Sequence, residues 1–210
     1  MQKLTLQNQG YWDRLQRAES WIQRAGNIKE WDDYHGPFIF YWIALNALYG
    51  RHLDSQRWEE QDLDWFLQRI CETDSGQGAI VNIVKESKRK ADRLLQDQFL
   101  LKLYWLEGTT AKVRRILAEE FSEAQVAFDR GKIEGYLKIL FRRLRILRNQ
   151  ILHGCSTDRH SLNKTSLQPA LEILEKIVPQ FCATFRDLGQ NYDWPKIPYP
   201  RKDSPQHPRG

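Results

Sequence analysis

The segment Arg148-Asn149-Gln150-Ile151-Leu152-His153-Gly154 combines three side chains that can act on a phosphate ester. The guanidinium of Arg148 carries a planar set of N–H donors that matches the oxygens of a phosphate. The amide of Asn149 can orient a hydroxyl or a phosphate, and the imidazole of His153 can accept or donate a proton near neutral pH. This set favours anion binding combined with general acid–base catalysis.

His153 also has a structural explanation that involves no chemistry. Gly154 is typical of the residue just after the end of a helix. A histidine in the last turn interacts favourably with the negative end of the helix dipole and can donate to free carbonyls there. Judged from the residues alone, this capping role is the commoner one.

The helix that carries the segment is expected from about Lys132 to His153, and it has two faces because successive residues turn by about 100°. Its apolar face contains Leu137, Leu140, Phe141, Leu144, Leu147 and Ile151. Its other face is a basic stripe without an acid, made of Lys138, Arg142, Arg145, Asn149 and His153. A solvated surface is the usual explanation for such a stripe.

Arg148 does not belong to the stripe, because it lies on the flank of the apolar face, about 140° from His153 on an ideal helix. Arginine is seldom fully buried unless it is paired. We therefore expect Arg148 at an interface or at the edge of a cleft, where a partner chain or an anionic ligand satisfies its donors.

Six further helical segments are expected around this helix, from apolar spacing and from glycine and proline boundaries. They are Tyr11 to Ala25, Pro37 to Tyr49, Arg57 to Glu72, Ala79 to Glu107 (continuous or with a break), Thr110 to Arg130, and Leu167 to Leu188. The second is apolar on every side and should be the buried centre of the domain. Within it, Asn46 needs a hydrogen-bond partner, either as a structural tie or as support for the motif helix.

The chain is therefore predicted to be all-α, with a bundle of about six to seven helices over residues 1–192. Residues 193–210 form a Pro-rich tail, which we expect to be extended or disordered. Its prolines are Pro195, Pro198, Pro200, Pro205 and Pro208.

Composition places the chain among ordinary globular proteins, with 41% hydrophobic and 28% charged residues in a total of 210. The formal net charge of +5 is compatible with an anionic partner such as RNA, without proving one. The three cysteines, Cys71, Cys155 and Cys182, are too widely spaced for a zinc site or a disulfide framework. We expect no metal and no cofactor, and a reducing, cytoplasmic location.

Membrane insertion and secretion are not expected. The N-terminal residues lack the apolar run of a signal peptide. The longest apolar run, Phe38 to Tyr49, is too short to cross a bilayer. Asp32, Asp33 and His35 could suggest a metal site, but three such residues before a helix are more typical of a helix-entry turn.

The motif segment resembles the signature of HEPN domains, in which a polar residue directly follows an arginine and a histidine comes after four to six intervening residues. Four residues separate Arg148 from His153 here. The segment Phe40 to Gly50 resembles the aromatic-rich core helix of bacterial HEPN proteins of the Apea-like kind. The resemblance covers about residues 10–190, although these two segments alone carry it specifically.

This resemblance implies an all-α bundle that commonly forms a homodimer, with two motifs facing each other across a cleft. Many HEPN proteins are metal-independent endoribonucleases, in which the RNA 2′-hydroxyl attacks the adjacent phosphate. The resemblance therefore implies an RNA-cleaving homodimer, in a toxin or phage-defence role that can include an antitoxin or another partner protein.

The family roles can be carried over to individual residues of the motif. His153 would be the general base or acid, Arg148 would bind the scissile phosphate, and Asn149 would orient the phosphate or His153. Flanking phosphates would be held by Lys138, Arg142 and Arg145 through charge alone. Asn46 is not carried over from the family: a structural tie is its commoner explanation, and support of the motif helix is the alternative.

Two alternatives remain open at this point. The chain could be a non-catalytic HEPN module that binds RNA, a nucleotide or a partner protein. It could also be a plain helical scaffold, in which Arg148 is an interface residue and His153 is a helix cap.

Overall fold

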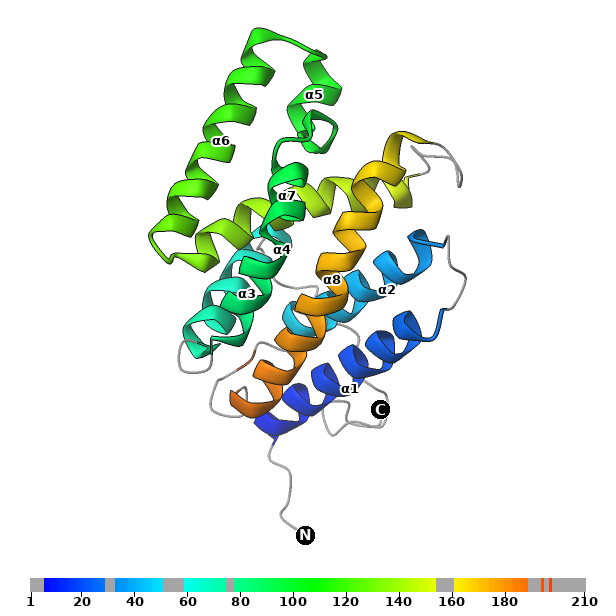
Figure 1. Cartoon of the computed structure of the whole chain (residues 1–210). Coiled ribbons are helices and arrows are strands. Elements are labelled where there is room, and N and C mark those ends of the chain that lie inside the picture. The colour runs from blue at the N-terminus through cyan, green and yellow to red at the C-terminus, as the bar shows by residue number, and fades with distance from the viewer. Residues whose placement is uncertain are drawn as a thin grey trace.

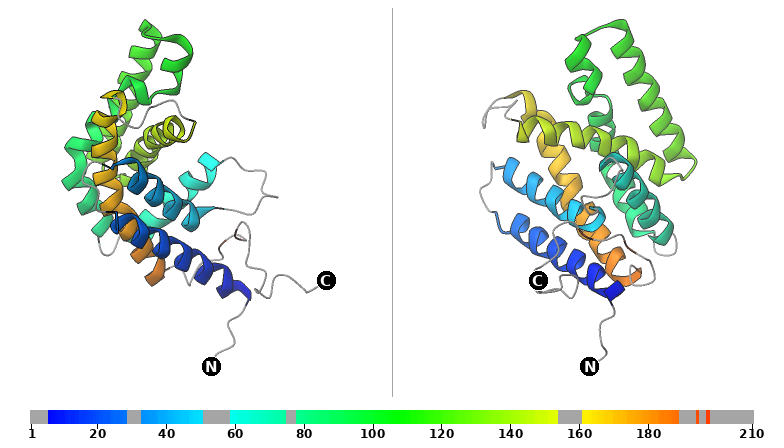
Figure 2. Two further views of the ribbon diagram at one scale, coloured as in Figure 1. Left: turned by 90° about the vertical axis from the view of Figure 1, so that its right-hand side faces the viewer. Right: turned by 180° about the vertical axis from the view of Figure 1, so that it is seen from behind.

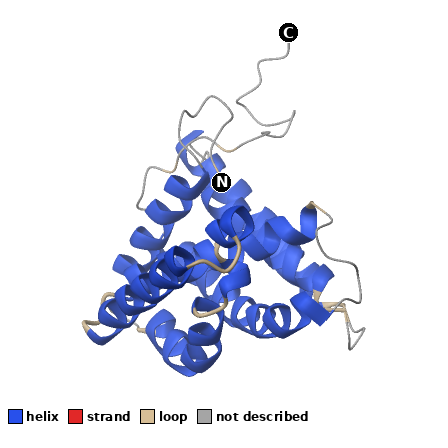
Figure 3. Ribbon diagram, turned by 90° about the horizontal axis from the view of Figure 1, so that it is seen from above, coloured by secondary structure: helices blue, strands red, loops and turns tan. Residues whose placement is uncertain are grey.

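The computed structural model describes residues 6–28, 33–50, 59–74, 78–153, 161–188, 194 and 197 of the 210-residue chain. These residues form eight α-helices, one 3-10 helix (η1) and no strand, which confirms the all-α fold class (Figure 1, Figure 3). The elements are α1 (Leu6–Gly26), α2 (His35–Tyr49), α3 (Glu59–Asp74), α4 (Ala79–Leu95), η1 (Gln98–Leu100), α5 (Lys102–Glu107), α6 (Ala111–Asp129), α7 (Ile133–Leu152) and α8 (Ser161–Leu188).

The described residues contain one α-helix more than the sequence suggested, because the segment from Ala79 to Glu107 is broken. The backbone is extended at Asp97 and again at Leu101, on either side of η1. The Asp97 carboxylate accepts hydrogen bonds from the backbone N–H of Phe99, at 2.9 Å, and from the hydroxyl of Ser166 on α8. A side chain that competes with the backbone in this way favours a turn over a continuous helix.

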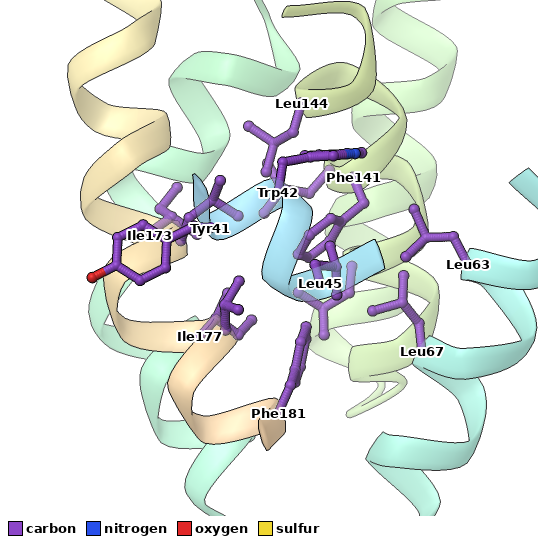
Figure 4. Packing of buried hydrophobic residues seen from close by; sticks show 14 of the residues in the cluster. Tyr41, Trp42, Leu45, Leu63, Leu67, Phe141, Leu144, Ile173, Ile177 and Phe181 are labelled. Carbon is purple, nitrogen blue, oxygen red and sulfur yellow. The ribbon is translucent and has the colours of Figure 1, made fainter. Parts of the chain in front are cut away.

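The centre of the bundle is α2, as its uniform hydrophobicity predicts. Trp42 and Leu45 are 2% and 0% exposed. Figure 4 shows them among side chains from three other helices, namely Leu63 and Leu67 of α3, Phe141 and Leu144 of α7, and Ile173, Ile177 and Phe181 of α8. Because large apolar side chains from four helices meet here, this core fixes the position of α7 relative to α2 and α3.

The C-terminal part of the chain differs from the prediction at both ends of α8. α8 begins at Ser161, six residues before the predicted start, and contains Pro169 and Pro179. Two residues of the predicted tail, Trp194 and Ile197, are described. The Trp194 ring lies 4.4 Å from that of Phe185, and Ile197 is 1% exposed, so the core extends past the expected domain boundary. The other residues of the tail lie outside the described part of the chain.

The helices α5 and α6 rise from one end of the bundle, and α1 runs beside α2 (Figure 1, Figure 2). α5 has no buried residue, whereas α6 buries Val113 and Ala124. Among the described residues, no helix is both long and apolar enough to cross a lipid bilayer.

Candidate functional site

The motif lies at the C-terminal end of α7, as predicted. α7 ends at Leu152, and His153 follows as its C-cap, with its backbone N–H donating to the carbonyl of Asn149 at 3.0 Å. Gly154, the expected helix terminator, lies outside the described residues. His153 is exposed and Asn149 is half-buried. Since residues four apart share a helix face, Asn149 and His153 form a polar pair at the accessible end of α7.

Arg148 points away from this end and toward α2 and α3. One of its terminal nitrogens donates to both carboxylate oxygens of Glu59, at 2.7 and 2.8 Å. The guanidinium lies 5.2 Å from the ring centre of Trp42, within range of a cation–π interaction. Its side chain is only 14% exposed. The sequence predicts a partner chain or an anionic ligand as the acceptor for Arg148, whereas the described structure provides the Glu59 carboxylate of the same chain.

Asn46 is connected to Arg148 through two intermediate side chains. The hydroxyl of Tyr49 is hydrogen-bonded to Asn46 Oδ1 and lies 3.1 Å from Oε1 of Glu59. Burial, together with the Glu59 carboxylate, raises the pKa of Tyr49 well above its ordinary value, so the phenol remains protonated and can donate. Asn46 therefore contacts the motif indirectly, through the residues that hold Glu59 in place.

Two arginines of the predicted stripe also contact acids of α3. A terminal nitrogen of Arg145 lies 2.5 Å from Oε2 of Glu60. Arg142 Nε lies 3.2 Å from Oε1 of the same carboxylate, and a terminal nitrogen of Arg142 lies 3.7 Å from Asp64 Oδ2. Burial raises the pKa of Asp64, although the charges of Arg142 and Lys138 oppose this shift. The basic stripe is therefore largely neutralised by α3 at these two positions.

Lys138 begins the stripe, one turn before Arg142, and lies far from the motif. It lines a cavity of about 590 Å³ together with Cys71 and Glu72 of α3 and Glu134 of α7. Burial raises the pKa of the Cys71 thiol to about 12, so this thiol is not a ready nucleophile. Lys138 precedes His153 by fifteen residues, or about 22 Å along a helix axis. The structure does not bring Lys138 together with the motif.

The side of α7 that faces α6 and η1 carries two buried polar residues that the sequence did not single out. Arg143 is 2% exposed, and a terminal nitrogen lies 2.7 Å from a carboxylate oxygen of Glu120 on α6. Gln150 donates from Nε2 to the carbonyl of Phe99 at 2.8 Å. These contacts fix the rotation of α7, and so determine that Asn149 and His153 face outward.

The acids of α3 are neighbours of the motif that sequence reasoning missed. The first turn of α3 is acidic, with Glu59, Glu60 and Asp62. Acids at the start of a helix are ordinarily explained by the helix dipole. The pairing of Glu59 and Glu60 with arginines more than eighty residues later follows only from the packing of α3 against α7.

Comparisons with protein-family models, with curated proteins and with solved structures each gave no match. The HEPN resemblance therefore rests on the motif at the end of α7 and on the aromatic-rich α2, and it stays a prediction. Within the described residues, no three His, Cys, Asp or Glu side chains gather as a metal site would require. Asp33 instead accepts a hydrogen bond from the N–H of Gly36 at 3.0 Å, at the entry of α2.

Proposed function

We propose that this chain is a metal-independent endoribonuclease of the HEPN type that acts as a homodimer, in a toxin or phage-defence role. The observation that carries the proposal is the pair of Asn149 and His153, one helical turn apart on the accessible end of α7. An acid–base group for RNA must be reachable by a polymer, and an exposed helix end satisfies this requirement.

In the proposed reaction the 2′-hydroxyl of RNA attacks the adjacent phosphorus, and the bond from phosphorus to the 5′-oxygen breaks. The neutral imidazole of His153 accepts the proton of the 2′-hydroxyl, or the protonated imidazole donates to the leaving 5′-oxygen. The products are a 2′,3′-cyclic phosphate and a 5′-hydroxyl. In a homodimer, His153 of each of the two copies could serve one of these two steps.

Arg148 would stabilise the negative charge that develops on the phosphate, and Asn149 would orient the phosphate or the imidazole. For Arg148 this role meets competition, because Glu59 already accepts from one of its terminal nitrogens. An incoming phosphate would have to displace the Glu59 carboxylate or use the remaining N–H groups of the guanidinium. Arg142 and Arg145 would face the same competition from Glu60.

The Arg148–Glu59 pair also favours a second candidate function, a non-catalytic HEPN module that binds RNA, a nucleotide or a partner protein. An arginine that is 14% exposed and paired with a carboxylate has the contacts of a structural residue. In such a module His153 caps α7, and binding needs neither Arg148 nor acid–base chemistry.

The two candidates are separated by incubating the purified protein with total RNA and tRNA in EDTA, followed by analysis of the RNA ends. Cleavage that leaves cyclic phosphate and 5′-hydroxyl ends, and that His153→Ala abolishes, supports the endoribonuclease. The matched control is Leu152→Ala, which truncates an adjacent side chain that is 56% exposed. Salt-sensitive retention of RNA without any product supports the binding module, and cleavage that persists in His153→Ala contradicts the catalytic assignment.

A further inference from the structure

An exposed tryptophan on α5 lies beside the end of α7 that carries His153. Trp105 is 56% exposed. Its indole N–H donates to the carbonyl of Phe99 at 2.8 Å, and the same carbonyl accepts the amide of Gln150 on α7, also at 2.8 Å. A single carbonyl thus joins Trp105 to the last turns of α7 and holds the indole at a fixed place relative to the motif.

The position of Gln150 on α7 shows which side of this helix Trp105 adjoins. On an ideal helix Gln150 lies about 60° from His153, but about 160° from Arg148. Trp105 therefore adjoins the side of α7 that carries His153. The opposite side carries Arg148, which faces Glu59 and Trp42.

Two aromatic rings contact Trp105, but neither stacks face to face on its indole. The Tyr104 ring lies 5.4 Å from Trp105 at an interplanar angle of 87°, and the Phe99 ring lies 6.5 Å away at 49°. Neither neighbour stacks flat on the indole. Single exposed apolar residues usually need no explanation, but an indole whose N–H is fixed presents a rigid, flat surface.

A positive charge accompanies this ring on the same face of α5. Lys102 lies three residues before Trp105, a spacing that puts both side chains on one side of a helix. Lys102 is exposed, and in the described part of the chain it has no ion-pair partner. The acid on α5, Glu107, is instead paired with Lys112. This charge differs from those of Arg142, Arg145 and Arg148, which α3 neutralises.

We propose that the Lys102–Trp105 face of α5 binds one nucleotide of single-stranded RNA, with the base stacked on Trp105 and a phosphate near Lys102. A base that stacks on a protein ring must be unpaired, so the substrate class is single-stranded RNA or a loop. Trp105 then places the neighbouring nucleotide at the exposed end of α7. This inference rests on the proposed function, because it assumes that RNA is the ligand.

The test is the affinity of the full chain for a labelled single-stranded 2′-O-methyl oligoribonucleotide, which cannot be cleaved, measured by fluorescence anisotropy. Trp105→Ala is expected to weaken binding about tenfold, the effect of losing one stacked base. Trp105→Phe should keep most of the affinity, because it keeps a flat ring. Lys102→Gln should reduce the dependence of log affinity on log salt by about one unit.

The matched control is Leu106→Ala, which truncates a side chain that is 72% exposed but not planar, and it should bind RNA like the native chain. If Trp105→Ala binds as tightly as the native chain, this inference is wrong and the proposed function stands. If the native chain binds no RNA, both fail. If Trp105→Ala and Leu106→Ala both reduce the mass of an oligomer and leave RNA binding unchanged, the face contacts a second copy of the chain.

Discussion

Two groups of polar side chains on the α7 helix have opposite surroundings. On the side toward α3, Arg142, Arg145 and Arg148 each contact a carboxylate of the same chain. At the end of the helix, His153 is exposed and Asn149 is half-buried. The difference shows that a row of basic residues in a sequence identifies a charge pattern and not its partner. The charges that look most suited to RNA are already satisfied by α3.

The comparison also distinguishes residues that hold α7 in place from residues that remain accessible to a ligand. The α3 side is held by ion pairs that require one fixed geometry, and this makes it a rigid support for α7. The accessible end adjoins the exposed ring of Trp105 on α5, the helix that also carries Lys102. We therefore expect changes at buried, paired positions of α7 to alter stability most, and changes at the open end to alter RNA binding most.

The largest effect on stability is expected at Arg143, the buried arginine on the side of α7 that faces α6 and η1. Arg143→Ala removes the partner of Glu120 and the donor to the Leu100 carbonyl, and it opens space in the core. We expect a loss of about 3 kcal/mol in the free energy of unfolding. Arg142→Ala, at the next position but 43% exposed, should cost less than about 1 kcal/mol. Urea denaturation measures both, and equal losses would contradict the distinction.

The next largest effect is expected from releasing Arg148. Glu59→Gln leaves the guanidinium without its carboxylate, so the free energy of unfolding should fall by about 1–2 kcal/mol. RNA affinity should rise several-fold, because a phosphate no longer competes with Glu59. The control is Glu72→Gln, an acid on the same helix in an exposed pair with Arg69. Indistinguishable RNA affinities for the two variants would mean that Glu59 does not restrict access to Arg148.

The double variant Arg142→Gln and Arg145→Gln tests whether the arginines paired with α3 contribute to RNA binding. If these arginines are already neutralised, RNA affinity at physiological salt should change less than about threefold. The alternative, in which both contact flanking phosphates, requires a fall of about two units in the salt slope of binding. Anisotropy titrations over a series of salt concentrations distinguish the two outcomes.

The smallest effect is expected at Asp64, the most distant acid of the α3 side. Burial raises its pKa above the value in the unfolded chain, despite Arg142. A carboxyl shifted in this direction favours folding below its unfolded pKa, and this contribution is lost as the pH rises through the folded pKa. Asp64→Asn should therefore leave stability at neutral pH unchanged or higher by less than about 1 kcal/mol.

The pH dependence of the free energy of unfolding tests the direction of this effect. The difference in stability between Asp64→Asn and the native chain should shrink toward acid pH, where Asp64 is itself uncharged. A loss of more than about 1 kcal/mol at neutral pH would show instead that the Asp64–Arg142 pair stabilises the fold.

The fold could be predicted from the sequence largely because helical periodicity and glycine boundaries are local signals. The end of α7 and the apolar α2 were expected at their observed places. The break between α4 and α5 was harder to predict, because it depends on Asp97 bonding to Ser166, sixty-nine residues away. The early start of α8 was missed because its first residues are polar, and such composition is also typical of loops.

The candidate site could be predicted only in part. The face of α7 that carries Asn149 and His153 follows from the helical repeat alone. The partners of Arg148 do not, because Glu59 and Trp42 reach it only through the packing of three helices. The nearness of Trp105 depends likewise on one carbonyl that accepts from two helices, a contact that no spacing in the sequence indicates.

The most direct test of the contrast between the arginines paired with α3 and the accessible end of α7 is to map where RNA contacts the protein. Single-stranded RNA containing 4-thiouridine is cross-linked to the full chain by irradiation, and the modified peptides are identified by mass spectrometry. Cross-links on residues 102–107 and 149–153 are the expected result. Cross-links confined to residues 138–145 of α7 and to α3 would contradict the account, because they would mean that RNA displaces the carboxylates and binds the basic stripe.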